Sequence, residues 1–259
     1  MGFIHMALLH LKNLTKYFGG LAAVKNVSFD LNEGSILGLI GPNGAGKTTV
    51  FNLITGHYVP DKGEIIFNGE NIVKKPTHKI VELGIARTFQ TIRLFKNLSV
   101  LENAMSGYHC RMKAGVFACM FKPAWQRLEE KKAIDIALKE LQFVGLNIDL
   151  EQQAKNLSYG NQRLLEIARA LTTSPKLLIL DEPAGGMNDQ ETKKLVNLIK
   201  KIRDRGITVL LIEHDMNLVM DVCEHIVVLD NGEKIAEGTP DEVKSDPKVI
   251  EAYLGLDEE

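Results

Sequence analysis

Residues 41–48 read Gly-Pro-Asn-Gly-Ala-Gly-Lys-Thr, which matches G-x-x-x-x-G-K-[ST], and they directly follow the apolar run 36–40. Glycines allow backbone N–H groups to close on anionic oxygens where a Cβ would obstruct the approach. Lys47 adds a point charge for the β- and γ-phosphates, and the Thr48 hydroxyl can ligate Mg²⁺. Residues 49–54 continue as a helix whose N-terminal dipole favours the same anion. This strand, loop and helix predict an α/β core that binds a nucleoside triphosphate.

The composition is that of an ordinary globular protein, with 259 residues, 45% hydrophobic and 25% charged. A net charge of −2 gives no electrostatic reason to expect nucleic acid as a partner. No apolar run is long enough to span a bilayer, and no secretion signal is visible. The three cysteines lack metal-ligand spacing, so we expect free thiols in a reducing, cytoplasmic compartment.

Two kinds of strand pattern divide the chain. Antiparallel strands on short turns are predicted for the N-terminal part, at 7–12, 24–31 and 63–67. Short buried strands alternating with helices are predicted for the C-terminal part, with strands at 177–180, 207–212 and 226–229 and helices at 189–205 and 218–222. Between them, helices are predicted at 125–144 and 161–172 and no strand signal appears.

We therefore expect a P-loop NTPase core with an N-terminal antiparallel β subdomain and an inserted helical subdomain. Residues 1–91 are predicted to form the first part of the nucleotide-binding core. Residues 92–172 form the helical subdomain, and residues 173–259 form the second part of the core with the C-terminal segment.

Two carboxylates end the apolar strand predicted at 177–180. Parallel strands deliver their C-terminal ends to the sheet edge that also carries the phosphate loop. Asp181 can then hold Mg²⁺ through water, and Glu182 can polarise an attacking water.

A second anion site is predicted at residues 157–163, Leu-Ser-Tyr-Gly-Asn-Gln-Arg, at the start of a helix. Ser158 and Gly160 offer a hydroxyl and exposed N–H groups there. One chain cannot easily use both anion sites on one γ-phosphate, so a head-to-tail pair of chains is the natural solution. The alternative is that Ser158 only caps the helix.

Together these stretches resemble the ATP-binding subunit of an ABC transporter, with 41–48 as Walker A, 157–163 as signature and 177–182 as Walker B. The resemblance implies ATP and Mg²⁺ as ligands and assigns three further roles. Tyr17 stacks on adenine, Gln90 reaches Mg²⁺ and the attacking water, and His214 hydrogen-bonds the γ-phosphate and orients the catalytic carboxylate.

The implied site residues fall into three groups. The catalytic residues are Lys47, Gln90, Glu182 and His214. The nucleotide-binding residues are Tyr17, Gly41, Pro42, Asn43, Gly44, Ala45, Gly46, Lys47, Thr48, Thr49, Ser158, Tyr159, Gly160 and Asn161. The metal-binding residues are Thr48, Gln90 and Asp181.

Residues 184–188, Ala-Gly-Gly-Met-Asn, depart from the family's usual Ser-Ala-Leu-Asp after Walker B. This puts in doubt whether the two nucleotide sites communicate in the usual way. Tyr159 and Asn188 resemble the branched-chain amino acid importer subfamily, the LivG-like ATPases, as do residues 84–90, 212–216 and 252–255.

The resemblance implies an ATPase that powers uptake of branched-chain amino acids from the cytoplasmic face of the membrane. Its implied partners are a second ATPase subunit, identical or different, permease subunits, and indirectly a substrate-binding protein. The helical part at 90–125 is the expected permease contact, and the apolar cluster 116–121 belongs either to it or to internal packing.

Other classes fit less well. Within transport, the alternative is a lipopolysaccharide-export ATPase. A DNA-maintenance ATPase needs a long coiled coil, for which the stretch between Lys47 and Leu157 is too short. A nucleotide kinase or GTPase gives no reason for residues 157–163, and the guanine-reading Asn-Lys-x-Asp is absent.

Overall fold

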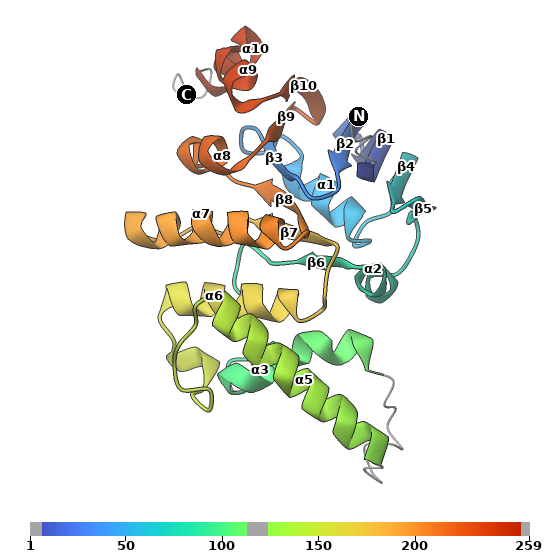
Figure 1. Ribbon diagram of the computed structural model, residues 1–259. Coiled ribbons are helices and arrows are strands. Elements are labelled where there is room, and N and C mark those ends of the chain that lie inside the picture. The colour runs from blue at the N-terminus through green and yellow to red at the C-terminus, as the bar shows by residue number, and fades with distance from the viewer. Residues whose placement is uncertain (1–6, 113–123, 255–259) are drawn as a thin grey trace, which may run out of the picture.

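The fold is built on two β-sheets, seen in a computed structural model that describes residues 7–112 and 124–254 (Figure 1). The first sheet is antiparallel and has the order β2-β1-β4-β5. Its strands are β1 (Ala7–Phe18), β2 (Leu21–Asn32), β4 (Lys62–Phe67) and β5 (Glu70–Asn71). Antiparallel pairing of the N-terminal strands was predicted, and the structure confirms it. Strands β1 and β2 are longer than the sequence pattern indicated.

The second sheet has the order β10-β9-β3-β8-β7-β6. Its strands are β3 (Ile36–Ile40), β6 (Ile85–Arg87), β7 (Leu177–Asp181), β8 (Thr208–Ile212), β9 (His225–Asp230) and β10 (Glu233–Gly238). Strands β3, β6, β7, β8 and β9 pair in parallel, and β10 closes the edge antiparallel to β9. The buried apolar strands at 177–180, 207–212 and 226–229 were predicted, whereas β6 and β10 were not.

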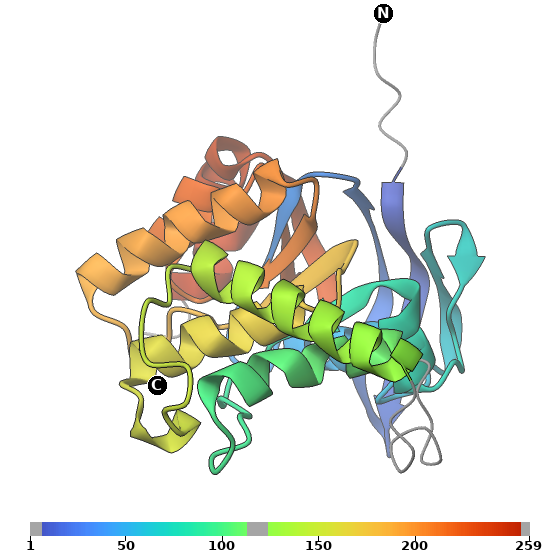
Figure 2. The same ribbon diagram turned by 60° about the horizontal axis from the view of Figure 1, so that its bottom comes forward.

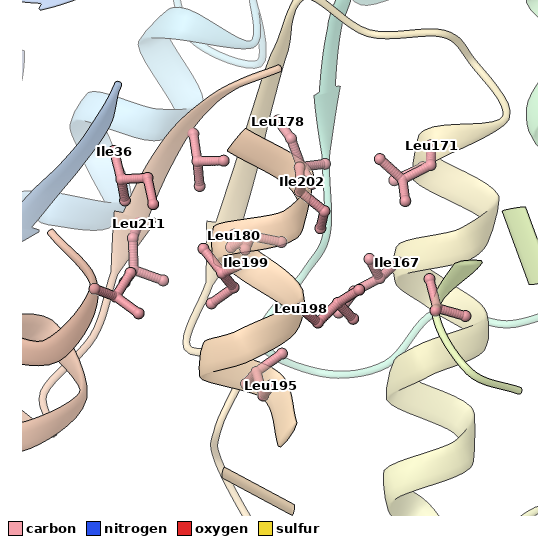
Figure 3. Close-up of a cluster of buried hydrophobic side chains, with 14 of the residues drawn as sticks. Ile36, Ile167, Leu171, Leu178, Leu180, Leu195, Leu198, Ile199, Ile202 and Leu211 are labelled. Atoms are coloured by element: carbon pink, nitrogen blue, oxygen red, sulfur yellow. The ribbon is translucent and has the colours of Figure 1, made fainter. Parts of the chain in front are cut away.

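Each parallel strand alternates its side chains between two apolar layers. In β7, Leu178 and Leu180 face the layer that holds helices α6 and α7, and Leu177 and Ile179 face the layer that holds α1. Figure 3 shows the first layer, where side chains of α7 fill the space between the sheet and α6. Burial on both faces explains why these strands are continuous apolar runs instead of alternating ones.

Helices connect the strands and cover the sheet. They are α1 (Lys47–Ile54), α2 (Thr77–Leu83), α3 (Val100–Tyr108), α5 (Ala124–Phe143), α6 (Tyr159–Leu171), α7 (Asp189–Asp204), α8 (Met216–Val222), α9 (Pro240–Ser245) and α10 (Pro247–Leu254). Two 3₁₀ turns, η1 (His109–Arg111) and η2 (Ala154–Asn156), complete the described elements.

Helices α3, α5 and α6 contact one another and form a helical lobe, which lies in front of the second sheet in Figure 2. The stretch 92–172 was predicted to be mainly helical, and its described residues contain helices and one isolated bridge between Ser99 and Gln153. Helix α6 begins at Tyr159, two residues earlier than predicted, because the Ser158 hydroxyl accepts the Asn161 N–H and caps it. The apolar cluster 116–121 lies outside the described residues.

Candidate functional site

The phosphate-binding residues 41–46 join β3 to α1, and Lys47, Thr48 and Thr49 form the first turn of α1. Lys47 is 9% exposed, and its Nζ donates to the carbonyl oxygens of Gly41 at 2.6 Å and Pro42 at 2.8 Å. Burial lowers the pKa of Lys47, although the nearby carboxylates of Glu182 and Asp181 oppose this shift. The ammonium therefore lies in the loop, electrostatically coupled to both carboxylates that follow β7.

Two loop glycines are required by close backbone approach. Gly41 has φ +146°, and a Cβ there would lie 2.0 Å from the carbonyl oxygen of Leu229 in β9. Gly46 has φ +100°, and its Cβ would lie 2.5 Å from the carbonyl oxygen of Ala23 in β2. Gly44 also has a positive φ, +81°, but a Cβ there would meet no described atom within 4 Å. The loop is thus packed against backbone from two sides, and Gly44 faces open space.

Asp181 ends β7 and is 5% exposed. Its Oδ2 accepts a hydrogen bond from Arg87 of β6 at 2.8 Å, and Arg87 also donates to Oδ1 of Asn52 in α1 at 2.7 Å. The Arg87 guanidinium therefore links Asp181, a candidate metal ligand, to helix α1. Arg87 was not predicted as a site residue, and its only signal in the sequence was its closeness to Gln90 in the chain.

Three of the predicted catalytic residues lie together. Gln90 Nε2 donates to Glu182 Oε2 at 2.7 Å, and His214 Nδ1 lies 3.9 Å from the same oxygen. Glu182 has φ +45°, an unusual backbone conformation for a non-glycine residue that often occurs at functional sites. Gln90 follows β6, Glu182 follows β7 and His214 follows β8, so neighbouring parallel strands bring them to one edge of the sheet.

The three predicted metal ligands line one pocket. Thr48, Gln90 and Asp181 contribute a hydroxyl, an amide and a carboxylate, and oxygen donors of this kind suit Mg²⁺. Arg87, Arg93 and His57 also line this pocket. The pKa of His57 is lowered by burial first, and then by the positive charges of Arg87 and Arg93. Thr48, Gln90 and Asp181 thus fit a magnesium ion that binds together with an anion.

The signature residues 158–161 occupy the first turn of α6, in the helical lobe. Helix α6 packs in the apolar layer on one face of the second sheet, and α1 packs on the other face. Figure 1 likewise shows α6 below and α1 above strand β6. A single chain therefore places Ser158 and Lys47 on different layers, as the prediction of a head-to-tail pair requires.

Tyr17 lies near the end of β1 and is 42% exposed. It pairs across the hairpin with Ala22, next to the Ala23 carbonyl that approaches Gly46. Its backbone N–H donates to Asp61 Oδ2 at 2.6 Å, which fixes the end of the strand. Tyr17 is thus exposed, and the strand residue that it pairs with precedes the residue whose carbonyl approaches the phosphate loop.

The segment that departs from the family pattern is held at both ends. The Ala184 N–H donates to the Glu213 carboxylate at 2.9 Å, and Asn188 caps α7 by accepting from Gln190 and Glu191. Between these residues, Gly186 has φ +76°, and a Cβ there would lie 3.2 Å from the Tyr159 ring. Asn188 thus acts as a helix cap, and the signature tyrosine rests on the glycine segment.

Glu213 was not singled out from the sequence, yet it is only 1% exposed at the end of β8. Its carboxylate accepts N–H groups of Ala184 at 2.9 Å and His214 at 3.1 Å. Burial raises the pKa of Glu213, and these backbone donors partly oppose the rise. It therefore connects the loop after Glu182 with the loop that carries His214.

This glycine loop between a parallel strand and a helix, with two carboxylates at the end of another parallel strand of the same sheet, defines a P-loop nucleotide-binding protein. The family model "ABC transporter" matches residues 24–185, and a model described as "Branched-chain amino acid ATP-binding cassette transporter" matches residues 233–259. The chain belongs to the ABC transporter family of ATP-binding cassettes. Its fold is the α/β cassette of that family, with an antiparallel sheet and a helical lobe.

Relatives match along nearly the whole chain. The high-affinity branched-chain amino acid transport ATP-binding protein LivG of Salmonella typhimurium is 47% identical, covering 96% of this chain and 98% of that protein. BraF of Pseudomonas aeruginosa, described in the same words, is 46% identical with the same coverage.

Solved structures of ABC transporter cassettes also match the chain. The ADP conformation of MJ1267, an ATP-binding cassette of an ABC transporter, is 37% identical with a TM-score of 0.84, covering 96% of this chain and 99% of that one. The dimeric post-hydrolysis structure of the cassette MJ0796, bound to ADP and Pi, is 26% identical with a TM-score of 0.76, covering 90% and 98%.

Proposed function

We propose that the chain binds ATP with Mg²⁺ and hydrolyses it to power uptake of branched-chain amino acids. The observation that carries the hydrolytic part is the contact between Gln90 and Glu182 at 2.7 Å, with His214 at 3.9 Å from the same carboxylate oxygen. A carboxylate that faces an amide and an imidazole beside a phosphate loop is suited to orient a water for in-line attack.

Each residue has a separate task in this reaction. The loop N–H groups and Lys47 bind the phosphates, and the charge of Lys47 stabilises negative charge that develops on the γ-phosphoryl group. Thr48, Gln90 and Asp181 would hold Mg²⁺, which would neutralise negative charge on the triphosphate. Glu182 polarises the attacking water, while His214 positions that carboxylate and contacts the γ-phosphate.

Tyr17 and residues 158–161 would complete the nucleotide site from two chains. Tyr17 is 42% exposed, so its ring is accessible for stacking on the base. Ser158 and the N–H groups after it would cap the triphosphate held by a second cassette, identical or different. The dimeric MJ0796 structure, bound to ADP and Pi, supports a paired arrangement.

The transported substrate is inferred from the relatives. LivG and BraF are described as branched-chain amino acid transport proteins, and the match at residues 233–259 is to a branched-chain amino acid cassette model. These similarities favour this cargo over lipopolysaccharide export. None of the described helices has the length and apolar character needed to cross a bilayer.

Permease subunits would hold the chain at the cytoplasmic face of the membrane, and a substrate-binding protein would act through them. A groove between α2, β6 and the helical lobe is lined by Val81, Phe95, Cys110 and Arg169 among others. Phe95 is 54% exposed, and Arg169 lies over its ring at 5.9 Å. An apolar and cationic surface of this kind suits a cytoplasmic helix of the permease. Residues 113–123, the end of the predicted contact segment, lie outside the described residues.

The substitution E182Q tests the hydrolytic proposal. It keeps the shape of the side chain but removes the charge that polarises water, so we expect ATP binding to persist while turnover falls about a hundredfold or more. ATP should also trap E182Q as a dimer in size-exclusion chromatography with light scattering. E64Q, at an exposed position on β4, serves as control and should hydrolyse ATP at the wild-type rate. Wild-type turnover by E182Q would refute the role given to Glu182.

The cargo is tested separately by uptake of radiolabelled leucine in cells that express the chain together with its permease and binding protein. E182Q should abolish this uptake, and E64Q should not. Hydrolysis without any stimulation by branched-chain amino acids would retain the ATPase and refute the assigned cargo.

A further inference from the structure

Helix α6 carries two oppositely charged side chains that are fully buried next to the backbone of Gln90. Arg163 and Glu166 are 0% and 1% exposed, and Arg163 NH1 lies 2.7 Å from Glu166 Oε2. Removing two charges from water costs more than their attraction returns unless further hydrogen bonds satisfy them. The partners of this pair outside α6 therefore indicate what it is for.

Those partners all lie in the segment 89–93. Arg163 donates to the carbonyl oxygens of Phe89 at 2.7 Å and Gln90 at 2.9 Å. Glu166 Oε1 accepts the N–H of Arg93 at 3.3 Å. The buried pair thus binds the segment on both sides of its middle, and it fixes the backbone of Gln90 to α6.

Stability alone does not account for the pair. Among the described residues, Arg163 Nε is one of a few buried side-chain nitrogen or oxygen atoms with no hydrogen-bond partner. Apolar side chains of similar volume often replace a buried ion pair without loss of stability. A pair that is incompletely satisfied, yet binds two consecutive carbonyl groups of the segment that carries Gln90, is better explained by positioning.

Gln90 and Ser158 therefore lie at two ends of one rigid unit. The Gln90 side chain contacts Glu182, its backbone is bound by Arg163, and Ser158 caps the same helix about one turn before Arg163. We propose that Arg163 and Glu166 are positioning residues that make Gln90 and the signature turn move together. This rests on the proposed function, because Ser158 would serve the nucleotide held by the partner cassette.

The consequence is a direct mechanical link between two nucleotide sites through one chain. Arg163 is the fifth residue of α6, close to the N-terminus that Ser158 caps. A displacement of Gln90 toward or away from Glu182 therefore moves the signature turn with it. If this link is removed, each site still binds its nucleotide, but the position of Gln90 no longer depends on the position of the signature turn. Turnover should fall while affinity for ATP stays.

The test compares two double variants of the full-length chain. R163M/E166M replaces the pair by apolar side chains that keep the packing but release segment 89–93. R205M/E140M is the matched control, since Arg205 NH1 and Glu140 Oε2, 2.6 Å apart, also join the core to the helical lobe without contacting that segment. R163K keeps the charge but presents one ammonium in place of a planar fork, so it should bind one carbonyl group and lie between wild type and R163M/E166M.

Three quantities are measured for each variant: the dissociation constant of a fluorescent ATP analogue, kcat for ATP, and the amide exchange rate of residues 89–93. For R163M/E166M we expect binding within about twofold of wild type, kcat reduced about tenfold to a hundredfold, and faster exchange at 89–93. R205M/E140M should leave kcat and the exchange at 89–93 unchanged.

Wild-type kcat and wild-type exchange in R163M/E166M would overturn the inference. Equal loss of kcat in both double variants would also overturn it, because the pair would then have only a structural role. If R163M/E166M fails to fold, R163K decides the matter, and wild-type kcat and exchange in R163K refute it. A wild-type chain that does not hydrolyse ATP would refute the proposed function, while the exchange at 89–93 would still test whether the pair holds Gln90.

Discussion

Replacing Gly41 by alanine should damage the phosphate loop through a backbone clash as well as through strain. A Cβ on Gly41 would lie 2.0 Å from the Leu229 carbonyl oxygen, whereas an ordinary contact is about 3.5 Å. Neither partner can rotate away, since one is fixed on the loop and the other belongs to strand β9. The loop, the strand or both must therefore move by about 1 Å or more.

The size of the effect follows from comparing Gly41 with Gly44. Both glycines have positive φ, so alanine costs about 1–2 kcal/mol at either position, less a gain of about 0.4–1 kcal/mol from restricting the unfolded chain. Only Gly41 meets backbone, which adds about 1–3 kcal/mol of overpacking. G41A should thus be less stable than G44A by about 2 kcal/mol, a factor of about 30 in the unfolding equilibrium.

Urea unfolding of the full-length chain without nucleotide measures the loss of stability, and unfolding with ATP measures how much stability nucleotide binding adds. G41A should unfold at lower urea than G44A and should gain less stability from ATP, because a displaced loop binds the phosphates poorly. Equal unfolding midpoints for the two variants would show that the loop does not rest on β9 as described.

Three further predictions concern two buried titratable groups. Burial raises the pKa of Glu213, so its favourable contribution is complete at acid pH and is lost as the pH rises through the native pKa. E213Q lacks this loss, so as the pH rises above the ordinary carboxyl value of 4.5 its free energy of unfolding should rise relative to wild type, and parallel profiles would refute this. E213Q should nevertheless turn ATP over more slowly, because an amide NH₂ then faces an N–H group of Ala184 or His214. Burial also raises the pKa of Cys223 to about 12, so maleimide at pH 7 should label it only after unfolding, as peptide mass mapping would show.

The parts of the fold that were predicted are those with a strong local signal. Strands β7, β8 and β9 are apolar runs because both of their faces are buried, and α7 shows helical spacing that ends at Gly206. Strand β6 has only three residues, and β10 is polar because it lies at the sheet edge. Neither segment has a distinct sequence pattern, since each depends on its neighbour strand for pairing.

The candidate site divides in the same way. Lys47, Asp181 and Glu182 belong to motifs that can be found in the sequence, and the structure places them at one sheet edge. Their roles in catalysis remain predictions. The contact of Arg87 with Asp181 joins residues far apart in the chain, so no local pattern could indicate it.

The buried pair in α6 and Glu213 were missed for a related reason. Arg163 and Glu166 are three residues apart among Leu164, Leu165 and Ile167, and charged pairs at this spacing are common on exposed helix surfaces, so the spacing alone does not indicate burial. Charged residues within an apolar run were the one available sign that the pair is enclosed. The sequence does not state which backbone groups such a pair binds.

The position of the phosphate loop in the sheet also determines when, during synthesis, the chain can first bind nucleotide. Strand β3 leaves the ribosome early, but its two neighbours in the sheet, β8 and β9, are made near the end of translation. The Leu229 carbonyl, which packs against the loop, belongs to β9, and the Gly232 N–H, which donates to the Ala45 carbonyl, follows it. The nascent cassette should therefore be unable to hold nucleotide until almost its whole length has emerged, and truncation before β9 should leave no partial activity.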